Sequence, residues 1–316
     1  MSFIRRIPIP MSALALATAS LGNLLLPYSS AIRAVCGVVA AVLALLVLAR
    51  IAFDFSGVRK ELENPAVMAV FPAFFMALML LATYLKPYAA APAQALWMGA
   101  LVVQLLVAVV FAYRFIGSFK LAQVLPGWFL VFVGFVVGSV TSPAFGAQSV
   151  GRVLLYAGLI GYVGVLAAVV YRMVKVGDLP EPALPTVAIF AAPPSLCLVG
   201  YLAVTPAKQA GVVYALLAIA AASLVYVLTR LPRILKTRFY PTYAALTFPF
   251  VISAIALKQS NVILAKTAAG SFIPKAAIMA MDGLATVMVL YVLVRYVMFL
   301  LAPVAEKAPE PAPATA

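Results

Sequence analysis

The sequence contains no histidine among its 316 residues and only two cysteines, Cys36 and Cys197. Histidine is the commonest metal ligand and the side chain whose charge changes nearest to neutral pH, so its absence argues against zinc sites and histidine-based hydrolase triads. Both cysteines lie within apolar runs and outside any CxxC motif, so we expect free, buried thiols. Walker and dinucleotide-binding glycine motifs are also missing. We therefore expect no enzyme, no catalytic residues, no metal site and no cofactor.

Charged residues are scarce as well, at 9% of the chain against about 25% in soluble domains. Hydrophobic residues reach 66% and the mean hydropathy is +1.15, which leaves too little polar surface to cover a water-facing globule. The composition predicts an all-α integral membrane bundle with membrane lipid as its surroundings. Acidic residues number 8 against 22 Lys and Arg. The cations stand singly between apolar runs and form no basic face, so nucleic acid is not an expected partner.

The chain divides into ten apolar segments of the length that crosses a bilayer, about 20 residues each. Together they predict one transmembrane domain over residues 1–302, followed by a Pro/Ala-rich tail at 303–316 that is expected to be disordered. The predicted spans are 8–27, 31–53, 65–85, 91–115, 125–142, 150–174, 184–204, 209–230, 240–258 and 274–301.

The distribution of cations predicts the orientation of these spans. Fifteen of the 22 lie at the N-terminus, in the loops after spans 2, 4, 6 and 8, or at the C-terminal end, and seven lie on the opposite side. Because loops rich in Lys and Arg stay in the cytoplasm, both termini are expected to be cytoplasmic, in a multi-pass protein of a bacterial-type plasma (inner) membrane.

Prolines mark an internal repeat. The odd-numbered spans open at Pro8, Pro65, Pro126, Pro185 and Pro241, at spacings of 57, 61, 59 and 56 residues. Proline suits the first turn of a helix, where its missing N–H would have no partner anyway. The regular spacing predicts a helical hairpin used five times, with each odd span running outward and each even span returning.

A second set of helix breakers follows within the odd spans, at Pro72, Gly134, Pro193–Pro194 and Pro249. An interior proline removes a helical hydrogen bond, and in lipid the freed carbonyl is tolerated where it faces protein or a watery cavity. Kinks at one depth in four related spans therefore predict that the odd spans surround a shared axis and that the smoother even spans form an outer layer. The alternative is that these prolines only shape helix packing.

The same segments resemble the tellurite-resistance/dicarboxylate transporter family, which includes bacterial tellurite-resistance proteins and plant slow-type anion channels. The likeness extends through Leu301. The segments that carry it are LALATASLGNLL (14–25), ELENPAVMAVFP (61–72), LPGWFLVFVG (125–134), IFAAPPSLCLVGYL (189–202) and YPTYAALTFPFVISAIA (240–256).

This resemblance implies five hairpins in quasi-fivefold arrangement around a central pore, and a homotrimer with one pore per protomer. It also implies that a phenylalanine of the ninth helix plugs the pore, and Phe248 in Thr247-Phe248-Pro249 is the matching residue here. Phe71, before Pro72, holds the same repeat position and is a second candidate for the gate. An apolar ring in a narrow pore blocks ions by dewetting. The alternative for Phe248 is a packed core residue.

The charges near the predicted pore favour anions. Asp282 is the one acid well inside a predicted span, whereas cation pathways generally need rings of acidic side chains. Asp282 serves either a transport cycle or an ion pair with Lys275 or Lys258. Cations gather near the predicted extracytoplasmic ends of spans 2, 9 and 10, and we expect Lys258 and Arg33 among them to attract anions. The alternative is that each cation reaches toward lipid headgroups.

Three functions follow as hypotheses. The first is a passive anion channel for small monovalent anions such as chloride and nitrate, gated by a pore phenylalanine. The second is a proton-coupled secondary transporter of C4-dicarboxylates, sulfite or tellurite in the same fold. A buried titratable relay would distinguish a carrier, and the sequence largely lacks one. The third is a structural or sensory membrane subunit without flux.

Overall fold

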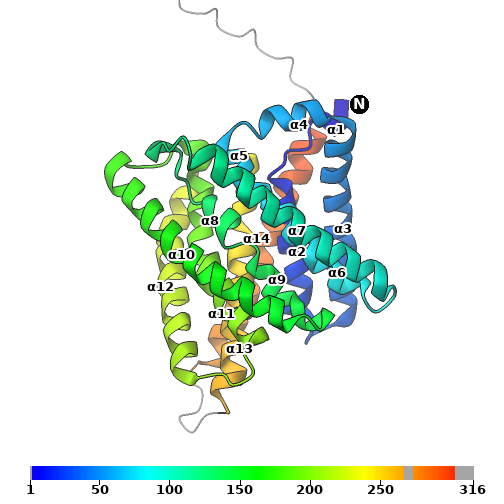
Figure 1. The fold of residues 1–316 in the computed structure, drawn as a ribbon, viewed down its shortest axis with the longest axis vertical. Helices are drawn as coiled ribbons and strands as arrows, with labels where there is room; N and C mark the ends of the chain where they lie inside the picture. Colours follow the sequence, from blue (N-terminus) through cyan, green and yellow to red (C-terminus); the bar gives the residue numbers. More distant parts are fainter. Residues whose placement is uncertain (1, 267–272, 303–316) are drawn as a thin grey trace, which may run out of the picture.

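The computed structural model describes residues 2–266 and 273–302, and within them it contains helices and no strand. The predicted disordered tail at 303–316 lies outside the described residues. Figure 1 shows a bundle in which some helices run along the long axis and others cross it obliquely. The elements are α1 Ser2–Arg5, α2 Met11–Leu25, α3 Ser30–Phe53, α4 Phe55–Glu61, α5 Pro65–Val70, α6 Pro72–Leu85, α7 Ala90–Phe115, η1 Leu121–Gln123, α8 Trp128–Phe132, α9 Val136–Thr141, η2 Ser142–Phe145, α10 Gln148–Val176, η3 Glu181–Ala191, α11 Ala192–Val204, α12 Ala210–Leu235, η4 Pro241–Leu246, α13 Phe248–Leu264 and α14 Lys275–Leu301.

Eight helical stretches of the described chain are long and apolar enough to cross a membrane, and this confirms an all-α integral membrane fold. The other two predicted spans, 8–27 and 125–142, correspond to shorter apolar helices, Met11–Leu25 and Val136–Phe145. Each odd-numbered span forms what we call an inner segment, and each even-numbered span forms an outer helix. The inner segments are α2, α5–α6, α8–α9–η2, η3–α11 and η4–α13, and the outer helices are α3, α7, α10, α12 and α14.

Burial separates the two sets. In the most apolar 18-residue stretch of each outer helix, 22–33% of the residues are buried, against 61–89% in the three inner segments that are long enough to compare. Chains of apolar side chains remain exposed along the outer helices, among them Val35, Val38, Leu45 and Val109. Such a surface suits lipid rather than water, because a soluble monomer rarely exposes large contiguous apolar patches.

Regular α-helix is interrupted within four of the inner segments. One helix ends at Val70 and the next begins at Pro72, and α8 ends at Phe132 before α9 begins at Val136. In the last two inner segments a 3₁₀ stretch gives way to α-helix at Ala192 and Phe248. Proline within a helix cannot donate to the preceding turn, which explains the break at three of these places. The outer helices, by contrast, are continuous over 24–29 residues.

The inner segments pack into a closed ring. α2 contacts α6, α6 contacts α9, α9 contacts α11, α11 contacts α13, and α13 returns to contact α2. Each of α2 and α6 also packs along the outer helix that follows it, α3 and α7 respectively, so the hairpin is the local unit of the fold. The inner segments therefore surround a central axis on all sides.

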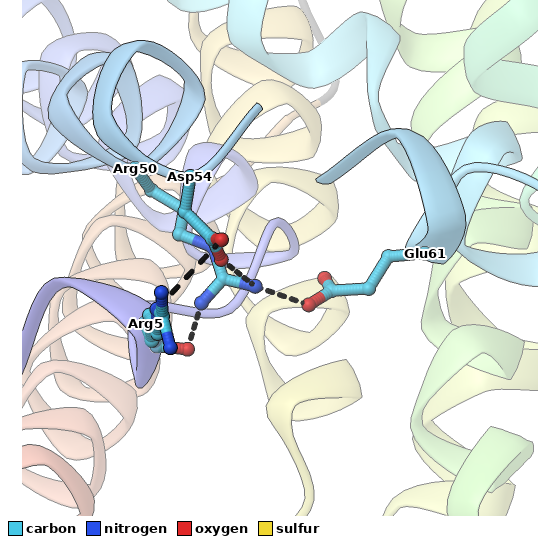
Figure 2. A network of polar contacts seen from close by, with 4 residues as sticks. All are labelled: Arg5, Arg50, Asp54 and Glu61. Atoms are coloured by element: carbon cyan, nitrogen blue, oxygen red, sulfur yellow. Dashed lines mark hydrogen bonds and ion pairs between the residues drawn. The ribbon is translucent and has the colours of Figure 1, made fainter. Parts of the chain in front are cut away.

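A polar cluster links the N-terminal segment to α3 and α4 (Figure 2). Arg50 near the end of α3 is 4% exposed and pairs with Asp54 at 3.1 Å and with Glu61 of α4 at 2.5 Å, and it also donates to the backbone carbonyl of Arg5. Burial raises the pKa of Glu61 above its ordinary value, against the opposing effect of Arg50. The sequence did not predict helix α4, whose place is fixed by this cluster.

Candidate functional site

A narrow cavity lies on the axis of the ring, and all five inner segments contribute to its wall. We call it the inner cavity; its volume is about 40 Å³, enough for a few water molecules. Its lining is almost entirely apolar and contains no residue of an outer helix. The lining residues are Pro10, Ala13, Leu16, Val70, Met76, Phe129, Leu130, Val133, Gly134, Thr186, Ile189, Ala192, Pro193, Leu196, Thr242, Ala244, Ala245, Phe248 and Pro249.

Two further cavities continue from the first. A middle cavity of about 190 Å³ is also lined by all five inner segments and shares Leu196 and Phe248 with the inner cavity. An outer vestibule of about 370 Å³ shares Asn23, Ile255 and Gln259 with the middle cavity. Because neighbouring cavities share wall residues, the three follow one another in order of increasing volume, and we call this series the axial path.

One face of α2 and one face of α13 follow this path. Ala13 and Leu16 line the inner cavity, and Ser20 and Asn23 follow along the middle cavity. On α13, Phe248, Ile252, Ile255 and Gln259 repeat the same progression. Spacings of three and four residues place side chains on one face of a helix, so two ordinary helical faces produce a continuous wall.

Phe248 lies where the inner and middle cavities meet. It is the first residue of α13, is 6% exposed, and contributes to the walls of both cavities together with Leu196 of α11. The preceding residue, Thr247, donates its hydroxyl to the carbonyl of Ala244 at 2.6 Å and so helps to fix the junction between η4 and α13. The inner and middle cavities therefore meet at two apolar side chains, which we call the apolar constriction.

The other predicted residues of the gate and the kinks divide into two groups. Gly134, Pro193 and Pro249 line the inner cavity, whereas Pro72, Pro194 and Phe71 line neither the inner nor the middle cavity. The ring of Phe71 instead packs edge-on against Phe75, with centroids 5.2 Å apart, and parallel to Phe74 at 6.4 Å. In this segment Val70 and Met76 face the axis, because the helix changes course between Val70 and Pro72.

Arg33 does not line the axial path but contacts a residue that does. Its Nε donates to Oδ1 of Asn23 at 3.0 Å, and its guanidinium lies over the ring of Tyr84 at 4.1 Å. Tyr84 in turn donates to the carbonyl of Ala19 at 2.6 Å. Since the amide oxygen of Asn23 is occupied by Arg33, its NH₂ group remains as the donor at the boundary of the middle cavity and the outer vestibule.

Lys258 lines the outer vestibule but carries a counter-ion. Its Nζ lies 2.7 Å from Oδ2 of Asp282 on α14 and 4.5 Å from the ring centre of Tyr28. The Tyr28 hydroxyl donates to the same carboxylate oxygen at 2.8 Å, while Oδ1 of Asp282 has no partner. Of the two partners considered for Asp282, the structure pairs it with Lys258. Much of the field of this lysine is therefore neutralised within the protein.

Sequence reasoning missed Leu196, Met76 and Asn23 as wall residues. Leu196 lies three residues beyond Pro193, and Met76 lies four beyond Pro72. Helical spacing from the kink prolines would have placed both on the axial side once that side was known. Asn23 was visible in the sequence as one of the few polar residues of an apolar span.

The closed ring, the broken inner helices and the axial path with an apolar constriction define a helical membrane transport protein of the channel or transporter class. Residues 6–297 match the SLAC1 family model, described as voltage-dependent anion channel, so the chain belongs to this family. The match confirms the resemblance seen in the sequence and indicates anion transport; members of the family are channels or transporters rather than enzymes. A search of curated proteins found no match.

Proposed function

We propose that this protein is a passive channel for small monovalent anions, chloride and nitrate among them, and that Phe248 closes its pore. The observation that supports this most directly is the axial path, whose inner and middle cavities lie between all five inner segments and share Phe248 and Leu196 as wall residues. An ion that crosses the junction between the phenyl ring of Phe248 and the side chain of Leu196 must shed water without compensation, which closes the pore until the ring moves.

The polar groups along the path suit anions that bind weakly. Asn23 presents an amide donor, Lys258 is held by Asp282, and most of the remaining wall is apolar. Conduction requires binding that is favourable enough to admit an ion and weak enough to release it. Neutral donors in an apolar wall meet both requirements for anions of low hydration cost.

Recordings from purified protein in planar bilayers test the proposal. Phe248→Ala is expected to raise the anion current about tenfold or more, the factor that corresponds to a barrier lowered by about 1.4 kcal/mol. Phe71→Ala is the matched control, since Phe71 holds the same repeat position but lies off the path, and its current should equal that of the unmodified protein. An unchanged current in Phe248→Ala would refute the gate, and equal increases in both variants would refute its assignment to Phe248.

A proton-coupled carrier of C4-dicarboxylates, sulfite or tellurite is the second candidate. The buried Asp282, with one carboxylate oxygen unpaired and Lys258 and Tyr28 on the other, is the feature that supports it. Electroneutral uptake into liposomes that depends on a pH gradient, without current, would favour this function. Absence of both current and uptake would favour a structural or sensory subunit.

We further propose the assembly that the family resemblance implies: ten spans in quasi-fivefold arrangement, a homotrimer with one pore per protomer, and both termini in the cytoplasm of a bacterial-type inner membrane. The closed ring of inner segments supports the fivefold arrangement. Mass photometry in lipid nanodiscs tests the trimer. Labelling of single cysteines, introduced near each terminus in a Cys36→Ser, Cys197→Ser background, tests the orientation.

A further inference from the structure

Gln104 is a polar side chain buried at the middle of outer helix α7 without a hydrogen-bond partner. It is 0% exposed, and neither Nε2 nor Oε1 of its amide has a partner in the described structure. A buried amide that loses water and gains nothing in return costs free energy, so buried polar groups nearly always have partners. The structure thus contains a hydrogen-bonding group whose partner is not a residue described in the protein.

The amide of Gln104 lies against the broken inner segment between α8 and α9. A β-carbon at Gly134 would lie 2.2 Å from the carbonyl oxygen of Leu130, 2.8 Å from the sulfur of Met76 and 3.0 Å from Nε2 of Gln104, so the absence of a side chain at Gly134 leaves room for all three. Gly134 and Met76 both line the inner cavity. Gln104 itself is not among the lining residues, so its amide lies directly behind Gly134 and Met76 in the wall of the inner cavity.

Further donors lie at the same break. Among the described residues, the N–H groups of Gly134 and Phe135 donate to no backbone carbonyl, because the helix is interrupted between Phe132 and Val136. Irregular backbone at membrane depth is tolerated where it lines a watery cavity, which can satisfy such groups. The two hydroxyls of the inner cavity are already committed as donors, Thr186 to the carbonyl of Ala183 and Thr242 to that of Pro182.

We propose that Gln104 and the break at Gly134 form a binding site for a small permeating anion beside the constriction. The amide NH₂ and the free N–H groups donate hydrogen bonds to the anion and replace part of its hydration in the inner cavity, the smallest of the three cavities. The site is neutral, so it excludes cations by the orientation of its donors rather than by charge. This inference rests on the proposed anion conduction and adds to it the residue that makes the ion's passage through the apolar section less costly.

The test uses the Phe248→Ala protein, in which current is measurable, and compares chloride, which is strongly hydrated, with thiocyanate, which is weakly hydrated. Gln104→Leu removes the donor at similar volume. It is expected to lower the permeability of chloride relative to thiocyanate about fivefold, the scale of one neutral hydrogen bond. Gln94→Leu is the matched control, because Gln94 is an exposed glutamine on the same helix, and its permeability ratio should not change.

A purely structural glutamine would give a different result. Gln104→Leu would then leave the permeability ratio unchanged while raising the unfolding temperature, since it removes an unpaired buried amide, and this outcome would overturn the inference. If Gln104→Leu does not yield monodisperse protein, Gln104→Met makes the same removal with a more adaptable side chain and is judged by the same ratio. Loss of all anion current from the parent Phe248→Ala protein would count against the proposed function instead, so the two failures are distinguishable.

Discussion

The inner segments and the outer helices have nearly the same amino-acid character but different structures. Both are apolar runs with few charges, yet the inner segments are mostly buried and four of the five are interrupted, whereas the outer helices are continuous and leave most of their residues unburied. The difference follows from what each set faces. An outer helix must satisfy its backbone by itself because lipid offers no hydrogen bonds, while an inner segment can leave backbone groups open toward a cavity.

This comparison predicts that the same kind of substitution lowers the free energy of unfolding by different amounts in the two layers. The largest effect is expected where a buried charged group loses its partner. Arg50 is an exception to the exposure of the outer helices, since it lies on α3 but is buried and pairs with Asp54 and Glu61. Arg50→Met should lower the free energy of unfolding by about 3 kcal/mol, because in a partly buried cluster it leaves Glu61 without its cation and Asp54 with only the more distant Arg5, at 3.8 Å. Denaturant unfolding in detergent micelles gives the measurement.

Arg233→Met is the control for Arg50→Met. Arg233 forms an ion pair with Asp178 at 3.0 Å, but both side chains are more than half exposed, so its loss should cost less than about 1 kcal/mol. Equal costs for the two substitutions would show that burial of the Arg50 cluster contributes nothing to stability.

A packing change compares the two layers directly. Ala17 on α2 is 0% exposed inside the ring, and Ala34 on α3 is exposed at the outer surface. Ala17→Leu should lower the free energy of unfolding by about 1–3 kcal/mol through overpacking. Ala34→Leu should change it by less than about 0.5 kcal/mol. Thermal unfolding followed by the fluorescence of the buried Trp97 and Trp128 measures both, and similar shifts would contradict the division into two layers.

The smallest expected effect concerns the contact between the layers at Lys258 and Asp282. Asp282→Asn removes the counter-ion and keeps the shape, so Lys258 should attract anions more strongly at the outer vestibule. In the Phe248→Ala background, we expect single-channel chloride conductance to rise about twofold at low ionic strength and much less at 1 M salt, where the Debye length is about 3 Å. A rise that does not depend on salt would show that the effect is not electrostatic.

Much of the architecture could be predicted from one chain because its signals are local. Proline at near-equal spacings marks the start of each inner segment, and a second breaker lies close to each observed interruption of the helix. The family resemblance singled out Phe248 within Thr247-Phe248-Pro249, and in the structure this residue lines both the inner and the middle cavity. Phe71 holds the same place before Pro72 yet packs on Phe74 and Phe75, because a repeat position does not specify which way a helix turns after a break.

Partners distant in sequence could not be predicted in the same way. Nothing in the sequence around Asn23 indicates that Arg33 holds its amide, nor that Gln104 on an outer helix reaches the break at Gly134. The sequence left Lys275 and Lys258 as possible ion-pair partners of Asp282. The packing of α13 against α14 brings Lys258 to this carboxylate.

By itself, the sequence determined that this chain is an apolar helical bundle built from repeated hairpins, and which residues interrupt its helices. These properties depend on composition, helical periodicity and the missing N–H of proline, all of which act within a few residues. The tertiary structure alone decided which faces of the inner segments meet at the axis, which phenylalanine stands on it, and which charges are neutralised. Those outcomes depend on close packing and on the distance between charges, and both are set only when segments far apart in the chain come together.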